Sequence, residues 1–144
     1  MEDPFDLQRF VDAQEPVIDR VRVELRAGRK ASHWMWFIFP QVAGLGRSPM
    51  AQHYAISSLA EAQAYLDHSL LGTRLRDCTR LVLDIKDRTS HQIFGSLDDV
   101  KFRSSMTLFA QVDLTGLFDQ ALTQFCGGEP DPATLEQLSK REGR

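Results

Sequence analysis

The chain has 144 residues, 42% of them hydrophobic and 26% charged, which is the composition of an ordinary globular domain. A chain of this length can bury a core without disulfides or metals, so we predict a single domain over residues 1–144. The formal net charge of -3 argues against sequence-independent nucleic-acid binding, which needs clustered lysine and arginine side chains to neutralise phosphates.

Neither a membrane span nor a signal peptide is expected. No uncharged apolar run approaches the length needed to cross a bilayer, and residues 1–4 are acidic, whereas a signal peptide begins with a basic region. Cys78 and Cys126 lie far apart in apolar segments, as expected of free thiols in a reducing compartment. We therefore predict a cytoplasmic protein that contacts neither membrane nor nucleic acid.

Apolar residues recur three and four positions apart throughout the chain, and this spacing predicts an all-α fold. Pro4 can begin a first helix that Pro16 interrupts, and a second helix ends at Gly28. Residues 33–39 favour a short buried helix, although their aromatic content also permits a strand. The glycines and proline of residues 44–49 predict a loop.

The second half of the chain continues this pattern. Ser58 and Glu61 have the spacing of a capping box at a helix start. The helix around residue 104 is expected to bury either Val100, Ser104, Leu108 and Val112 or Ser105 with its neighbours. Residues 140–144 are expected to form a frayed tail. In total we predict about seven helices. From the capping box onward, the predicted helices run through residues 58–66, 71–85, 97–112, 117–125 and 131–138, and residues 89–95 form a single turn.

The first candidate site is a run of ten residues, 32–41, that contains both tryptophans of the chain. His33, Trp34, Trp36 and Gln41 each carry a polar group, and a buried donor without a partner costs about 1–3 kcal/mol. The side chains could line a cavity for a flat ligand. They could equally be two core tryptophans and a histidine bonded to a backbone carbonyl, and the sequence leaves both interpretations open.

The second candidate site is one face of the helix predicted over residues 97–112. Asp98, Lys101, Ser104 and Ser105 are three or four positions apart and so lie side by side. They offer an acceptor, a cation and hydroxyls, which suit a phosphate, a carboxylate or a sugar. Spacing alone favours the alternative, an exposed Asp98–Lys101 pair with small residues where two helices approach closely.

Other candidate motifs are weak. Arg47 and Ser48 follow two glycines in a loop that could bind an anion through its backbone, but a connecting loop explains them equally well. The histidines and cysteines have no metal-ligand spacing, so neither a metal nor a cofactor is predicted.

Charged residues near the first two predicted helices have structural interpretations. Arg26, Arg29 and Lys30 are explained as cations at a helix C-terminus. Glu24 is expected to be solvated and Glu61 to cap a helix, which leaves no pair of catalytic carboxylates.

With these segments identified, the chain resembles an uncharacterised, mostly helical bacterial family of unknown function that includes a mycobacterial hypothetical protein. One departure is Ser69, where the family pattern would have proline. The resemblance covers nearly the whole chain and rests on the motifs at residues 32–41, 44–48, 61–68, 71–75, 93–95 and 101–109.

Two further resemblances are looser. The label calpastatin is sometimes attached to this family, but calpastatin is a disordered repeat protein, whereas this chain has the composition and periodicity of a packed domain. The helical order and the segment at 101–109 are also similar to a family thought to act on ADP-ribose and related N-glycosides. Similarity at this level does not transfer an activity.

Two functional hypotheses follow. In the first, a pocket binds a phosphorylated or ribosylated molecule, such as a nucleotide-like or ADP-ribose-like ligand. Trp36 would stack on it, Lys101 and Arg47 would hold anionic oxygen beside Ser104, and His33 would act as acid or base. His33 and Lys101 are then the catalytic residues, and an N-glycosidic bond is the predicted target of hydrolysis. In the second, the chain is a non-catalytic protein–protein interaction module or a homo-oligomer.

Overall fold

The computed structural model describes residues 2–143, and these contain ten α-helices and no strand. The all-α prediction is confirmed. The predicted count of about seven helices is too low, because α3, α4 and α7 are helices of only four or five residues. The helices are α1 Gln8–Gln14, α2 Ile18–Arg26, α3 Met35–Ile38, α4 Pro49–His53, α5 Leu59–Asp67, α6 Leu71–Leu83, α7 Ser90–Phe94, α8 Asp98–Ala110, α9 Leu117–Cys126 and α10 Pro132–Arg141.

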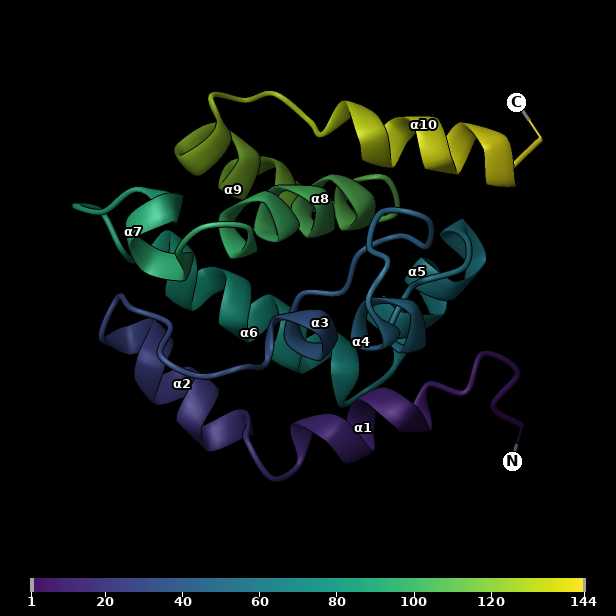
Figure 1. The fold of residues 1–144 in the computed structure, drawn as a ribbon, viewed down its shortest axis with the longest axis horizontal. Coiled ribbons are helices and arrows are strands. Elements are labelled where there is room, and N and C mark those ends of the chain that lie inside the picture. Colours follow the sequence, from purple (N-terminus) through teal and green to yellow (C-terminus); the bar gives the residue numbers. More distant parts are fainter. Residues whose placement is uncertain (1, 144) are drawn as a thin grey trace.

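Two long helices, α6 and α8, organise the packing (Figure 1). Helix α6 packs against α2, α5 and α9, and α8 packs against α7, α9 and α10. The short α3 contacts both of these long helices, α6 and α8, and also α1. The tryptophan-rich run and the helix that carries Ser104 therefore meet in space, although about seventy residues separate them in the sequence.

Helix α3 forms because its side chains are buried. Met35, Phe37 and Ile38 lie in the core, and each such side chain contributes about 1.5–3 kcal/mol on burial. The carbonyl of Phe37 accepts a hydrogen bond from Gln14 Nε2 at 2.7 Å, which ties α3 to α1. The predicted short buried helix at this position is therefore confirmed.

A cluster of four phenylalanines joins the end of α3 to the helices that surround it. Phe39 lies edge-on to Phe94 and Phe102, with ring centroids 5.9 and 5.2 Å apart, and Phe94 stacks on Phe102 at 4.7 Å. Phe125 of α9 meets Phe102 edge-on at 6.1 Å. Such pairs add about 0.5–1.5 kcal/mol each beyond the burial of area, so this cluster fixes the position of α3 against α8.

Helix α4 was not predicted. Ser48 caps it by accepting a hydrogen bond from the Ala51 N–H, and Pro49 occupies its first position, so the turn signals of this segment begin a helix of five residues. The chain on either side is joined by a single parallel bridge between Val42 and Ile56. The Ile56 N–H donates to the carbonyl of Gln41 at 2.9 Å, which holds that residue in place.

Two sequence predictions need correction, one about the cap of α5 and one about the buried face of α8. Ser58 caps α5 as expected, but Glu61 bonds the N–H of Ser57 rather than that of Ser58, so the reciprocal capping box is not formed. In α8 the expected inner residues Ser104 and Leu108 are buried, but Val100 is 57% exposed. The buried face includes Phe102 and Phe109, because the phenylalanine cluster sets the rotation of the helix.

The remaining predictions follow the residue pattern. The helix predicted over residues 71–85 is α6, and the residues at helical spacing on its inner face, Leu71, Leu75, Cys78 and Val82, are buried. Both cysteines are free thiols. Lys140 and Arg141 form the last turn of α10 within the segment predicted as a frayed tail, and residue 144 lies outside the described residues. Among the described helices, none combines the length and apolar character required to cross a bilayer.

Candidate functional site

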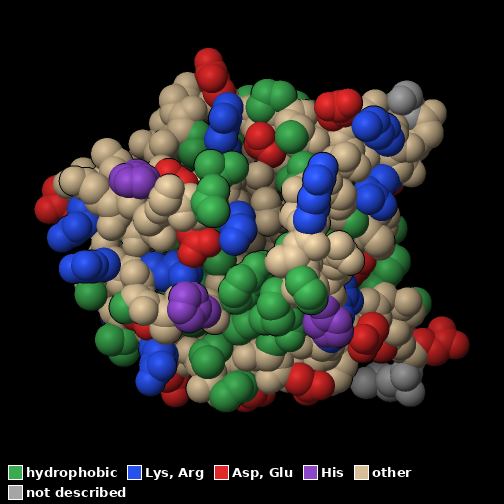
Figure 2. Space-filling view, in the orientation of Figure 1, with side chains coloured by type: hydrophobic (Ala, Val, Ile, Leu, Met, Phe, Trp, Pro, Cys, Tyr) green, Lys and Arg blue, Asp and Glu red, His purple; other side chains and the backbone are tan. Residues whose placement is uncertain are grey.

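A groove of about 300 Å³ lies between α8, the loop that follows α3 and the start of α10. We call it the α8 groove, and its walls are mostly apolar. Figure 2 shows hydrophobic side chains gathered over α3, with acidic, basic and histidine side chains around them. The residues that line the α8 groove are Gln41, Leu45, Gly46, Leu97, Val100, Lys101, Ser104, Asp131 and Ala133.

Lys101 connects the α8 groove to the tryptophan-rich run. Its ammonium nitrogen lies 5.3 Å from the ring centroid of the half-buried Trp36, within the range of a cation–π contact. The same nitrogen lies 3.3 Å from Asp98 Oδ1, and the Lys101 side chain is 26% exposed. The Lys101 ammonium therefore provides a positive charge at the groove wall and also contacts the Trp36 indole.

Asp98 also binds a second lysine, which sequence reasoning missed. The Lys30 ammonium lies 2.8 Å from Asp98 Oδ2 and 5.2 Å from the ring centroid of Trp34, and its side chain is only 8% exposed. The sequence predicted Lys30 only as a cation at a helix C-terminus. In the structure it is part of a Lys30–Asp98–Lys101 cluster that contacts both indoles. The sequence could not reveal the Lys30–Asp98 contact, because it depends on α8 lying beside the segment that follows α2.

Trp34 is a core residue rather than a lining residue. It is 1% exposed, and its indole Nε1 donates to Glu24 Oε1 at 2.9 Å. The same carboxylate accepts hydrogen bonds from the N–H groups of Ala31 and Ser32, at 2.7 and 3.1 Å, and from the Ser32 hydroxyl at 2.6 Å. The prediction that Glu24 is solvated is wrong: the residue is 8% exposed and holds residues 31–34 in place.

The pKa of Glu24 is lowered from its usual value of 4.5. Burial alone would raise this pKa, but the hydrogen bonds from Ser32, the Ala31 N–H and Trp34 outweigh it, because all of them favour the charged carboxylate. Glu24 therefore favours its ionised form, and it holds the Trp34 indole near which the Lys30 ammonium lies.

The two serines of α8 have different surroundings. Ser104 lines the α8 groove, and its hydroxyl lies 2.9 Å from Asp131 Oδ2 and 3.1 Å from the carbonyl of Val100. Asp131 also caps α10 by accepting from the N–H and hydroxyl of Thr134, at 3.2 and 2.6 Å. Ser105 is fully buried outside the groove lining, and its hydroxyl has no hydrogen-bond partner among the described residues.

Of the other predicted site residues, one lines the α8 groove and the rest are outside its lining. Gln41 lines the groove, whereas His33 is exposed and does not. Arg47 is exposed in the loop beside Gly46, and the hydroxyl of Ser48 is engaged in capping α4. The structure therefore brings together Gln41, Trp36, Lys101, Asp98 and Ser104, but not His33, Ser48 or Ser105.

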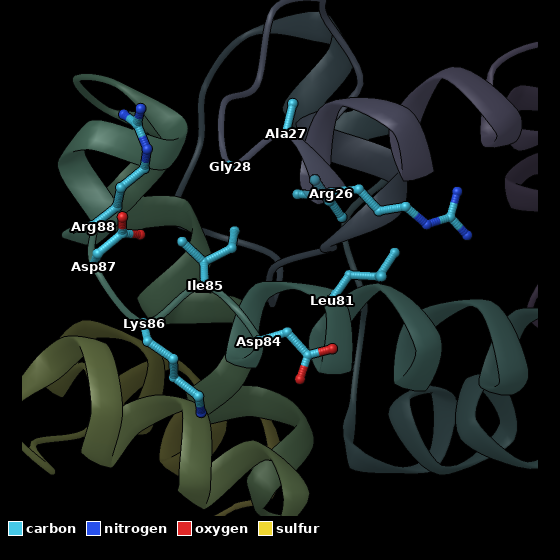
Figure 3. A pocket seen from close by; sticks show the side chains of 10 residues that line it. Arg26, Ala27, Gly28, Leu81, Asp84, Ile85, Lys86, Asp87 and Arg88 are labelled. Atoms are coloured by element: carbon cyan, nitrogen blue, oxygen red, sulfur yellow. The ribbon is translucent and has the colours of Figure 1, made fainter.

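A second pocket, of about 410 Å³, lies where α2 and α6 end (Figure 3). Arg26, Lys86 and Arg88 line it with Asp84 and Asp87. The basic side chains point away from one another in Figure 3, so they do not converge on one anion. None of the residues predicted to form a site lines this pocket, and its mixed charges are those of an ordinary solvated surface. No group of residues that could hold a metal ion occurs in the described part of the chain.

Comparison with known proteins matches the chain to one family and to a solved structure. The family described as "Protein of unknown function (DUF1810)" matches residues 4–138. The crystal structure of the conserved hypothetical protein Rv1873 from Mycobacterium tuberculosis is 56% identical in sequence and superposes with a TM-score of 0.93, covering 95% of this chain and 99% of that one. No curated protein is significantly similar. These findings confirm the resemblance drawn from the sequence.

Proposed function

The chain belongs to the DUF1810 family of proteins of unknown function, and we propose that it binds a small phosphorylated or ribosylated ligand in the α8 groove. The observation that carries the proposal is the position of Lys101. Its ammonium lies at the wall of an apolar groove and within cation–π distance of Trp36. A ligand with a flat or apolar body and an anionic group matches that combination.

The polar groups of the α8 groove support this ligand class. Lys101 carries three N–H donors, of which the contact with Asp98 uses one, so two can meet an anionic oxygen. Gln41, which also lines the groove, adds a side-chain amide, and its backbone carbonyl is held by the Ile56 N–H. Few polar groups on mostly apolar walls are typical of small-molecule sites.

The proposal extends to hydrolysis of an N-glycosidic bond, in which water adds to the anomeric carbon, the C–N bond breaks and the leaving nitrogen takes up a proton. Such a reaction needs an acid or base within about 3 Å of the reacting atoms, directly or through one water. His33 was predicted for that role and lies outside the groove lining. Binding is therefore the function that the geometry supports best. Hydrolysis is tested separately, on the same samples.

The test is a titration with ADP-ribose, NAD and nucleotides, followed by tryptophan fluorescence. We expect saturable quenching by at least one of them, with Lys101→Met weakening binding at least about tenfold. Trp36→Phe should remove most of the signal, because Trp34 is buried against Glu24. Lys86→Met, which removes an exposed lysine from the second pocket, is the matched control and should bind normally.

The same samples test hydrolysis by chromatography of the nucleotide products. Release of a free base or of free ribose phosphate that is lost in His33→Ala and Lys101→Met would establish the enzyme. Absence of quenching by every compound, in wild-type protein of confirmed fold, would contradict the binding proposal itself.

A second candidate function is a non-catalytic interaction module. Leu97 and Val100 border the α8 groove and are 71% and 57% exposed, which gives this edge an apolar surface. Light scattering should then show a complex or an oligomer that Val100→Lys disrupts. A monomer that recovers no partner from lysate would rule against this candidate.

A further inference from the structure

We propose that Asp98 is an internal competitor for Lys101, which a phosphate-bearing ligand displaces, and that Lys30 is the positioning residue that draws Asp98 away. This inference rests on the proposed function and names its anion site. Lys101 lines the α8 groove, and Asp98, which is outside the groove lining, contacts its ammonium at 3.3 Å. An anion in the groove therefore competes with the Asp98 carboxylate for Lys101.

The two lysines hold Asp98 unequally. Lys30 approaches one carboxylate oxygen at 2.8 Å and is 8% exposed, whereas Lys101 approaches the other at 3.3 Å and is 26% exposed. The shorter and more buried pair is the stronger one, because water screens it less. Asp98 also occupies the first position of α8, where the helix dipole favours a negative charge at that end.

Lys30 cannot follow Lys101 towards a ligand. Its backbone N–H is bound to the carbonyl of Ile93 at 2.7 Å, and its ammonium lies against the buried Trp34 ring. Separating a buried ammonium from its only carboxylate among the described residues is costly. When an anion arrives, the Asp98–Lys101 contact therefore opens, and the Lys30–Asp98 pair persists.

This geometry predicts an order of affinities for inorganic phosphate. Asp98→Asn should bind phosphate about tenfold more tightly than wild type, because a like charge beside the site is removed and Lys101 is released. Lys30→Met should bind it more weakly by a similar factor, although Lys30 itself does not line the groove. A lysine that only stabilised the fold would not produce these opposite effects on phosphate affinity.

The experiment is calorimetric titration of the full chain with inorganic phosphate at constant ionic strength. Asp84→Asn and Lys86→Met are the charge-matched controls, since both residues are exposed in the second pocket, and they should leave the phosphate affinity unchanged. Circular dichroism confirms the fold of each variant.

If Asp98→Asn does not fold because Lys30 is left buried without a carboxylate, the double variant with Lys30→Met and Asp98→Asn decides the question. It removes both buried charges and still frees Lys101, so it should bind phosphate more tightly than Lys30→Met alone. Equal affinities of wild type and Asp98→Asn would overturn the inference while leaving the proposed function intact. Failure of every variant and of wild type to bind phosphate would also overturn the inference, and the titration with ADP-ribose, NAD and nucleotides then decides the proposed function separately.

Discussion

Replacing Glu24 is the perturbation that the structure constrains most sharply. Its carboxylate accepts four hydrogen bonds from Ala31, Ser32 and Trp34 while only 8% of the residue is exposed. Glu24→Ala leaves the buried Trp34 indole N–H and the backbone N–H groups of Ala31 and Ser32 without their acceptor. An unpaired buried donor costs about 1–3 kcal/mol, so we expect a loss of about 4 kcal/mol of unfolding free energy for the three.

Glu24→Gln removes the negative charge of the side chain but keeps its size and shape. Three of the four bonds end on Oε1, so an amide oxygen in that position keeps these acceptors but not their charge. Hydrogen bonds to charged groups exceed neutral ones by about 1 kcal/mol or less each, and we expect a loss of about 2 kcal/mol. Urea unfolding followed by circular dichroism at pH 7 measures both variants.

The stability of the wild type should also depend on pH through this residue. Because the native pKa of Glu24 lies below its usual value of 4.5, its contribution is complete above that pH and is lost as the pH falls through the native pKa. Glu24→Gln should flatten this acid limb. The matched control is Glu136→Ala, which breaks only an exposed pair with Lys140 and should cost less than about 0.5 kcal/mol. A Glu24→Ala loss no larger than that of the control would refute the reasoning.

Three further predictions concern single positions. Leu97 has a φ of 72° and is 71% exposed, so Leu97→Gly should relieve backbone strain and raise the unfolding free energy by about 1 kcal/mol in urea titration. In Gly72→Ala the new Cβ would lie 2.0 Å from the Leu66 carbonyl oxygen, and a thermal melt should show destabilisation of about 2 kcal/mol or more. Burial raises the pKa of the Cys78 thiol to about 12, so a thiol reagent at pH 8 should label it only after unfolding, whereas the half-buried Cys126 reacts in the native protein; equal labelling by mass spectrometry would contradict this.

The helices that could be predicted from the sequence are those with a local signal. The inner face of α6 repeats at helical spacing, and Asp131 with Pro132 marks the start of α10 as expected. The orientation of α8 could not be predicted, because Val100 and Phe102 are both apolar and only the distant rings of Phe39 and Phe94 select the buried one.

In the candidate site, too, the local contacts could be predicted from the sequence and the contacts between distant segments could not. The spacing of Asp98 and Lys101 placed them on one helix face, and the structure adds Trp36 behind them. Lys30 and Glu24 were missed because their partners lie in other segments or across a turn, and a charged residue in a sequence is expected to be solvated unless its partner is known.

The most direct measurement of the central claim is a ¹⁵N–¹H correlation spectrum of the protein titrated with ADP-ribose. The chain has two tryptophans, so its indole region contains two peaks. We predict that the Trp36 indole and the amides of Gln41 and Lys101 shift together, while the Trp34 indole, held by Glu24, stays in place. Shifts confined to the pocket around Arg88, or no shift at saturating ligand, would contradict the account.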